Sequence, residues 1–184
     1  MSDPAHAVPV GVAIPSASPA ATYRLAFELA SVAMPGDLIC LWGDLGAGKT
    51  VFAKGFGAGL EVVETISSPT FVLMAEYVGR IALFHLDLYR LAGAEDALAG
   101  GLIDDRQISG VTLVEWPDRL GAALPADRLD IRIEGAGDDP RKIILEPGTA
   151  DLGRYGAAAV TGTEAPPVPG SAIAAGGPGD SPVG

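Results

Sequence analysis

The chain has 184 residues, of which 48% are hydrophobic and 19% are charged, and its formal net charge is −11. Its length and composition predict one globular domain that is large enough to bury a core. Because an acidic chain gains nothing from counterion release on a polyphosphate backbone, its charge disfavours direct, high-affinity binding to RNA or DNA.

The cysteine content and the hydropathy pattern indicate in which cellular compartment the protein is expected. The single cysteine, Cys40, excludes a disulfide scaffold and a cysteine-rich metal site, and it is interpreted as a buried strand thiol. The first residues lack a basic segment and contain several prolines, so we expect no signal peptide. No run approaches the roughly 18 apolar residues that a membrane span requires. We therefore expect a cytoplasmic protein with no membrane partner.

The composition divides the chain into three parts. Residues 1–17 are rich in alanine, proline and valine without a period, and they predict a flexible N-terminal arm. Residues 151–184 are rich in glycine, alanine and proline. Such a segment cannot bury enough apolar area to offset its ordering entropy, so we expect a disordered tail. Residues 18–150 are expected to form the folded domain.

Helix and strand patterns alternate within that domain. Ser18-Pro19 is typical of an N-cap followed by proline at the first helical position, and it predicts a helix over 20–33. Two further helices are predicted over 49–60 and 94–99. The predicted strands cover 38–42, 71–78, 80–86, 111–115, 129–134 and 141–145. Because helices and strands interleave early and strands cluster late, the pattern predicts an α/β sandwich with a mixed sheet.

A glycine-rich segment follows the first predicted strand. Residues 43–50 read GDLGAGKT and fit the phosphate-loop pattern G-x-x-x-x-G-K-[ST] at every fixed position. The glycines let the backbone curl so that its amides point at phosphate oxygens, Lys49 bridges the β- and γ-phosphates, and Thr50 supplies a hydroxyl to Mg²⁺. The side chain of Asp44 is expected to point outward. The expected nucleotide-binding residues of the loop are Gly43, Asp44, Leu45, Gly46, Ala47, Gly48, Lys49 and Thr50.

Two predicted strands end in an acidic residue. Asp87 and Glu115 each have the position of a Walker-B carboxylate, which reaches Mg²⁺ directly or through water. Which of them is the direct ligand stays open, but the longer side chain of Glu115 is better placed to orient an attacking water. His85 is interpreted as a packed strand residue on the same face as Asp87. Trp116 is either a core residue or one that flanks the nucleotide.

Two further features concern the ligand. The segment 67–70 follows the phosphate-loop helix, where the Thr70 hydroxyl could sense Mg²⁺ and the γ-phosphate; the alternative is an ordinary polar turn. The chain contains no asparagine, which removes the usual Asn/Lys-x-Asp motif for guanine and favours adenine.

Four segments together resemble the TsaE family: GDLGAGKT, SPTF, HLDLYRL at 85–91 and VEWPDRL at 114–120. This family, formerly YjeE, is the bacterial ATPase subunit of the machinery that makes N6-threonylcarbamoyladenosine at position 37 of tRNA. The resemblance covers about residues 22–145. It implies that ATP is bound rather than GTP, and that residues 18–150 form a P-loop ATPase domain. The implied fold is a P-loop NTPase-like three-layer sandwich, with parallel strands at the sheet centre and antiparallel strands at its edges.

The resemblance also implies roles and partners. Trp116 would lie near the nucleotide, and Asp87 and Thr70 would be switch or γ-phosphate-side residues. Members resemble weak ATPases that act on a TsaD–TsaB complex, where hydrolysis resets the transferase, so tRNA would be contacted only indirectly. The implied catalytic residues are Glu115, Asp87 and Lys49, and the implied metal ligands are Thr50, Glu115 and Asp87.

Two other functions remain as alternatives. A P-loop kinase of a small metabolite would typically need an arginine-rich lid, and Arg90, Arg106 and Arg119 are too scattered to form one. A nucleotide-binding switch with negligible hydrolysis would use the same residues. Arg141 and Lys142, in the last predicted hairpin, are a basic pair that could reach a nucleotide.

Overall fold

The fold is built on one sheet and four α-helices. The computed structural model describes residues 11–69, 72–100, 102, 105–149 and 151–162. The strands are β1 Val12–Ser16, β2 Leu38–Trp42, β3 Met74–Tyr77, β4 Ala82–Asp87, β5 Gly110–Glu115, β6 Leu129–Glu134 and β7 Arg141–Pro147. The helices are α1 Pro19–Ala30, α2 Lys49–Gly59, α3 Ala94–Ala99 and α4 Gly153–Gly162, with 3₁₀ helices η2 Asp105–Ser109 and η3 Pro117–Ala123.

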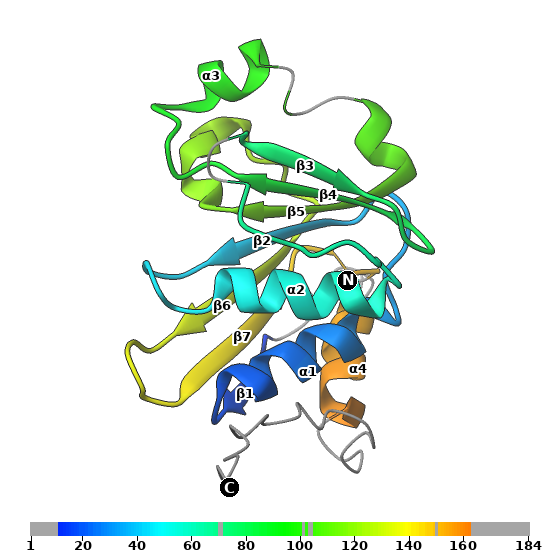
Figure 1. Ribbon diagram of the computed structural model, residues 1–184, viewed down its shortest axis with the longest axis vertical. Coiled ribbons are helices and arrows are strands. Elements are labelled where there is room, and N and C mark those ends of the chain that lie inside the picture. The colour runs from blue at the N-terminus through cyan, green and yellow to red at the C-terminus, as the bar shows by residue number, and fades with distance from the viewer. Residues whose placement is uncertain (1–10, 70–71, 101, 103–104, 150, 163–184) are drawn as a thin grey trace, which may run out of the picture.

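The sheet has seven strands in the order β1-β7-β6-β2-β5-β4-β3 (Figure 1). The central pairs β6–β2, β2–β5 and β5–β4 are parallel, whereas β3, β7 and β1 join antiparallel. Every residue of β5 is buried, as expected of a parallel strand that is covered on both faces. The predicted α/β fold, with a parallel centre and antiparallel edges, is confirmed.

Helices cover both faces of the sheet, which gives the predicted three layers. On one face α1, α2 and α4 pack over the larger core cluster, which includes Leu29, Phe56 and Tyr155 (Figure 1). On the other face α3 and η3 enclose a smaller cluster that contains Cys40, Phe84 and Leu120. Within the described ranges, no helix is long and apolar enough to cross a membrane.

The predicted N-terminal arm is wrong in part. The sequence predicts a loose segment over 1–17, whereas Val12–Ser16 form the edge strand β1 paired with β7. The side chains alternate, with Ile14 and Ser16 buried and Pro15 exposed. Pro15 has no backbone N–H to donate, and it is tolerated because β1 is an edge strand. Because this strand is short and rich in small residues, its sequence shows no clear alternation of apolar and polar positions. Residues 1–10 lie outside the described residues.

The predicted tail is also wrong in part, because the sequence predicts disorder from residue 151 whereas Gly153–Gly162 form α4. No proline interrupts residues 151–162, and Leu152, Tyr155 and Ala159 are buried against the sheet. Local composition concealed a helix that tertiary packing stabilises. Residues 163–184 lie outside the described residues.

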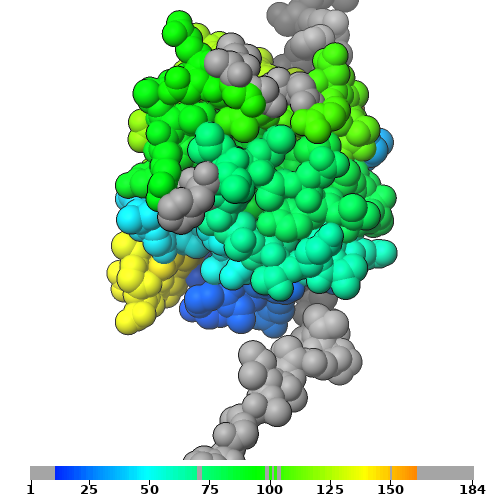
Figure 2. Space-filling view, turned by 45° about the horizontal axis from the view of Figure 1, so that its top comes forward, coloured from blue at the N-terminus to red at the C-terminus, as the bar shows by residue number. Residues whose placement is uncertain are grey.

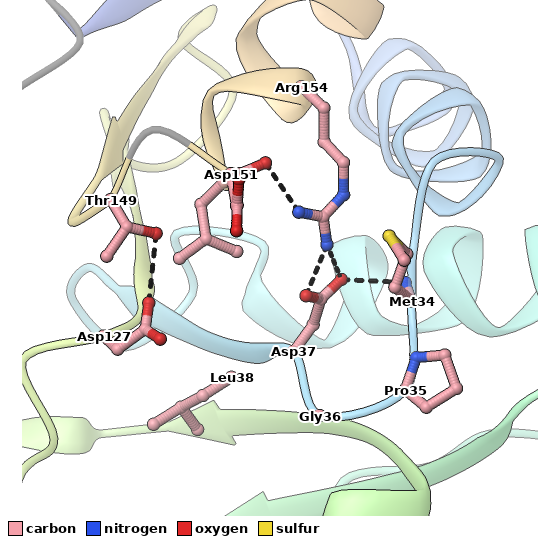
Figure 3. Close-up of a pocket in the computed structure, with 10 residues that line it drawn as sticks. Met34, Pro35, Gly36, Asp37, Leu38, Asp127, Thr149, Asp151 and Arg154 are labelled. Carbon is pink, nitrogen blue, oxygen red and sulfur yellow. Dashed lines mark hydrogen bonds and ion pairs between the residues drawn. The ribbon is translucent and has the colours of Figure 1, made fainter. Parts of the chain in front are cut away.

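Asp37 anchors α4 to the start of β2 (Figure 3). Its carboxylate accepts hydrogen bonds from the Arg154 guanidinium, from the Tyr155 hydroxyl at 2.6 Å and from the Met34 amide at 2.8 Å. Met34, Asp37 and Arg154 border a pocket of about 470 Å³. The pocket lies at the amino end of β2, whereas the phosphate loop follows the carboxyl end of the same strand.

Cys40 provides a test of the core. Burial raises the pKa of its thiol to about 12, and the nearby Asp130 carboxylate acts in the same direction. The folded state therefore favours the neutral thiol. The resulting gain in the free energy of unfolding is present below pH ~8.5, the pKa of the thiol in the unfolded chain, and is lost as the pH rises toward the pKa in the folded chain. We expect the folded chain to resist a thiol reagent at pH 8 and to react fully in urea. Rapid labelling of the folded chain would contradict this burial.

Candidate functional site

The loop between β2 and α2 has the backbone that its glycines predict. The φ angles of Gly43, Gly46 and Gly48 are 144°, 81° and 112°, in the region that side chains disfavour. A Cβ atom on Gly43 would also lie 2.6 Å from the Ile133 carbonyl oxygen, so this position must be glycine. Asp44 is exposed, as predicted for its side chain, and Leu45 is 78% exposed.

The loop lies at the surface among segments that are distant in sequence. Figure 2 shows its cyan atoms between the yellow turn that joins β6 to β7 and green residues on the other side. Parallel strands place their carboxyl ends at a common edge, so β2, β4 and β5 all deliver residues here. The predicted site residues of these strands are therefore brought together.

Lys49 begins α2 and folds back over the loop. Its Nζ donates hydrogen bonds to the carbonyl oxygens of Gly43 and Asp44, at 2.6 and 3.0 Å. The residue is only 5% exposed. Burial lowers the pKa of Lys49, while Glu115 and Asp87 oppose that shift by attraction. The ammonium is thus held where it would meet phosphate oxygens above the loop.

The two strand-end acids lie side by side. Asp87 on β4 and Glu115 on β5 are partners in the parallel register, and each is 3% exposed. The hydroxyl of Thr50 donates to Glu115 Oε1 at 3.3 Å, so the predicted metal-side hydroxyl and carboxylate are in contact. Asp87 instead accepts from the Ser68 hydroxyl at 2.5 Å and from the Tyr89 amide at 3.1 Å.

These residues fit a shared magnesium site. In the described part of the chain, no group of three or more His, Cys, Asp or Glu side chains is arranged to hold a metal ion. A phosphate-loop site needs fewer, because Mg²⁺ commonly uses one or two protein ligands with waters and phosphate oxygens. Thr50 and Glu115 supply such a pair, with Asp87 on the neighbouring strand. Thr70, the remaining predicted residue, lies outside the described residues.

Trp116 lies against the phosphate-loop lysine. Its ring centroid is 3.8 Å from Lys49 Nζ and 4.9 Å from the Tyr89 ring. The backbone of Trp116 is left-handed, with φ 60° and ψ 51°, which is uncommon for a bulky residue and turns the chain from β5 into η3. Trp116 therefore lies beside the loop lysine, and it also packs against the smaller core cluster. The sequence predicts no role for Tyr89, although it lies within the HLDLYRL segment at 85–91, because only the fold brings its ring against Trp116.

His85 is fully buried on β4, as the packed-strand interpretation predicts. The structure adds a contact that this interpretation missed, because His85 Nε2 lies 3.0 Å from Glu115 Oε1. The two-residue strand period placed His85 on the face of Asp87. Only the pairing of β4 with β5 reveals that Glu115 shares that face.

Arg141 ties the β6–β7 hairpin to the phosphate loop. Its Nε donates to the Ala47 carbonyl at 3.0 Å, and other nitrogens donate to the carbonyls of Gly137 and Asp139. Arg141 therefore reaches the loop backbone, whereas Lys142 is exposed and pairs with Glu134 at 3.5 Å. Of the basic pair in the sequence, only Arg141 contacts the site.

We expect Arg141→Ala to loosen the phosphate loop. It removes charge-assisted hydrogen bonds whose loss corresponds to about 1.5 kcal/mol or more, so the amides of residues 44–48 should exchange hydrogen roughly tenfold faster. The matched control Lys142→Ala should leave that exchange unchanged, because its ion pair is exposed. Hydrogen exchange followed by mass spectrometry measures both. Equal exchange in the two variants would remove Arg141 from the loop's support.

Comparison with known proteins identifies similar chains. A family described as "Threonylcarbamoyl adenosine biosynthesis protein TsaE" matches residues 16–143. The tRNA threonylcarbamoyladenosine biosynthesis protein TsaE of Bacillus subtilis is 43% identical over 139 residues, which is 75% of this chain and 85% of that protein. The protein of the same name from Treponema pallidum is 41% identical over 110 residues, covering 60% of this chain and 82% of the relative.

A solved structure agrees with these relatives. The crystal structure of Bacillus subtilis YdiB superposes with a TM-score of 0.65 at 36% identity. The match covers 86% of this chain and 97% of that one. The likeness therefore includes the whole layered fold, and the described phosphate loop lies within the residues that the family matches.

Proposed function

Because the chain belongs to the TsaE family of threonylcarbamoyladenosine biosynthesis proteins, we propose that it is the Mg²⁺-dependent ATPase subunit of that tRNA modification. Its ATPase activity would be weak alone and would be activated by TsaD-like and TsaB-like partner proteins in the cytoplasm. The observation that carries the proposal is the contact of the Thr50 hydroxyl with Glu115, 3.3 Å apart, beside a buried Lys49. Such a constellation serves binding and hydrolysis of a triphosphate.

Each residue of the proposed site has a role that follows from its position. The loop amides and Lys49 would bind the β- and γ-phosphates, since Lys49 is held over the loop by the carbonyls of Gly43 and Asp44. Bound Mg²⁺ would neutralise charge on the phosphates, held by Thr50 with Glu115 or Asp87. The nearly buried carboxylate of Glu115 would orient the attacking water and accept its proton. Trp116 and Tyr89 would shield the phosphates from bulk water on one side.

A small cavity beside the loop suits the nucleoside. It measures about 210 Å³ and opens between the start of α1 and the β6–β7 turn, next to the phosphate loop. Its lining includes Ser18, Thr22, Gly48, Val51 and Arg141. The absence of asparagine from the chain supports adenine over guanine as the base.

The net charge supports an indirect role at tRNA. With a formal charge of −11, the chain would be repelled by a polynucleotide at long range. If a partner protein binds the tRNA, this chain does not need to bind it directly. Hydrolysis would then reset the partner complex between turnovers.

A phosphate-release assay tests the proposal. The full chain is incubated with Mg²⁺ and ATP, alone and with purified TsaD-like and TsaB-like proteins, and the Lys49→Ala variant serves as the blank. We expect slow release alone and faster release with the partners. No release under either condition would reject the ATPase and favour a binding-only switch, whereas phosphate on a metabolite would favour a kinase.

A further inference from the structure

The metal-side carboxylate is held from behind by a buried histidine. Glu115 Oε1 accepts the Thr50 hydroxyl at 3.3 Å and lies 3.0 Å from His85 Nε2. In the described part of the chain, both hydrogen bonds of this carboxylate thus use Oε1, and none reaches Oε2. One oxygen is fixed by the protein, and the other remains available to a ligand.

The sheet explains why His85 can do this. In the parallel pairing of β4 with β5, His85 is the partner of Leu113, and Asp87 is the partner of Glu115. Side chains two residues apart share a face, so the imidazole lies beneath the carboxylate. Both groups are buried, with His85 at 0% and Glu115 at 3% exposure. The histidine side of this contact is therefore shielded from bulk solvent.

The protonation pattern of the ring follows from its surroundings. A carboxylate without a proton can only accept, so in the proposed arrangement the hydrogen of this bond would be on His85 Nε2. The other ring nitrogen, Nδ1, is buried and has no hydrogen-bond partner among the described residues. Of the two ring nitrogens, Nε2 therefore has the one hydrogen-bond contact of the His85 ring in the described part of the chain, and that contact is with Glu115.

We propose that His85 is a positioning residue that aims Glu115. By holding Oε1 together with Thr50, it leaves Oε2 to face the attacking water of the proposed hydrolysis. The kinetic effect of this positioning rests on the proposed function. The contact between His85 and Glu115 does not depend on that function. Because His85 is fully buried, it would act through Glu115 and not through direct contact with a ligand.

Two amide substitutions separate positioning from packing. In His85→Gln, the side-chain amide nitrogen reaches the place of Nε2 and can still donate to Glu115. In His85→Asn, the amide overlies Nδ1 and stops short of the carboxylate. Phe84→Leu is the matched control, because it alters the same strand on the opposite face of the sheet. Thermal unfolding confirms that each variant is folded before it is assayed.

The expected result is a loss of rate without a loss of binding. His85→Asn should release phosphate at least tenfold more slowly, since misplacing a catalytic group by about 1 Å can cost up to ~100-fold. Its Kd for ATP should stay within about threefold of the native value. His85→Gln should recover most of the rate, and Phe84→Leu should retain it. A glutamine variant as slow as the asparagine variant, or an asparagine variant with native rate, would overturn the proposal.

NMR tests the bond independently of hydrolysis. The chain has two histidines, so the His85→Asn spectrum assigns the His85 ring nitrogens. We expect the hydrogen on Nε2, and a change in the Nε2 shift on Glu115→Ala. A ring protonated only on Nδ1, or an unchanged shift, would overturn the positioning role. A native chain without turnover would reject the proposed function alone, and this spectrum would still decide the role of His85.

Discussion

Lys49→Ala is expected to weaken triphosphate binding severely. Lys49 is 5% exposed, and its ammonium is held by two loop carbonyls, so it is already organised for phosphate oxygens. Removing one partner of a buried charge pair costs about 2–5 kcal/mol, which corresponds to at least ~30-fold in affinity. Isothermal titration of ATP with Mg²⁺ measures the loss.

The control for this variant lies on the same helix. Lys54 is exposed on α2, so Lys54→Ala removes an equal charge without touching the loop. Its affinity for ATP should equal that of the native chain. Circular dichroism checks that Lys49→Ala is folded, because the variant also leaves Asp87 and Glu115 without their nearby cation. Native affinity in a folded Lys49→Ala chain would remove the phosphate loop from the proposed site.

Glu115→Ala should separate binding from turnover. The loop and Lys49 remain, so ATP should bind with a Kd close to the native value. Without the carboxylate, the attacking water and the metal lose their orientation, and losing one such preorganised group costs about 100- to 1,000-fold in rate. Phosphate release and titration of ATP, measured on the same preparation, give the two quantities.

An exposed glutamate provides the comparison. The side chain of Glu146, on β7, is 46% exposed and pairs with Arg132, so Glu146→Ala should keep both binding and turnover. Equal turnover in Glu115→Ala and the native chain would remove Glu115 from the catalytic residues. A parallel loss of binding would instead assign it chiefly to the metal.

The phosphate loop could be predicted because its parts are contiguous. The positive φ angles that the motif demands occur at Gly43, Gly46 and Gly48, and Lys49 starts the helix that was expected to follow. The acids were predictable for a related reason. Asp87 and Glu115 end buried strands, and parallel pairing brings such ends to one edge.

Contacts between distant segments could not be predicted in this way. Arg141 reaches the loop across 94 positions of sequence, and the contact of His85 with Glu115 needs the order of the strands. The same holds for β1 and α4, whose amino-acid composition does not indicate regular secondary structure. Among the described residues, β1 pairs with β7 alone, and α4 is anchored by Asp37. Neither element can therefore be predicted from its own residues. Local composition predicts a segment's preference, and tertiary contacts override it.

The position of Trp116 places a fluorophore inside the site. Its ring lies 3.8 Å from Lys49 Nζ, and the chain has only one other tryptophan. That residue, Trp42, donates its indole N–H to Asp130 at 2.7 Å, and the Arg132 guanidinium lies 5.0 Å from the centre of its ring. A cation close to an indole perturbs its emission, so any ligand that draws the ammonium off the ring is registered optically. We therefore expect the emission of Trp116 to change when a ligand occupies the phosphate loop, with no added dye.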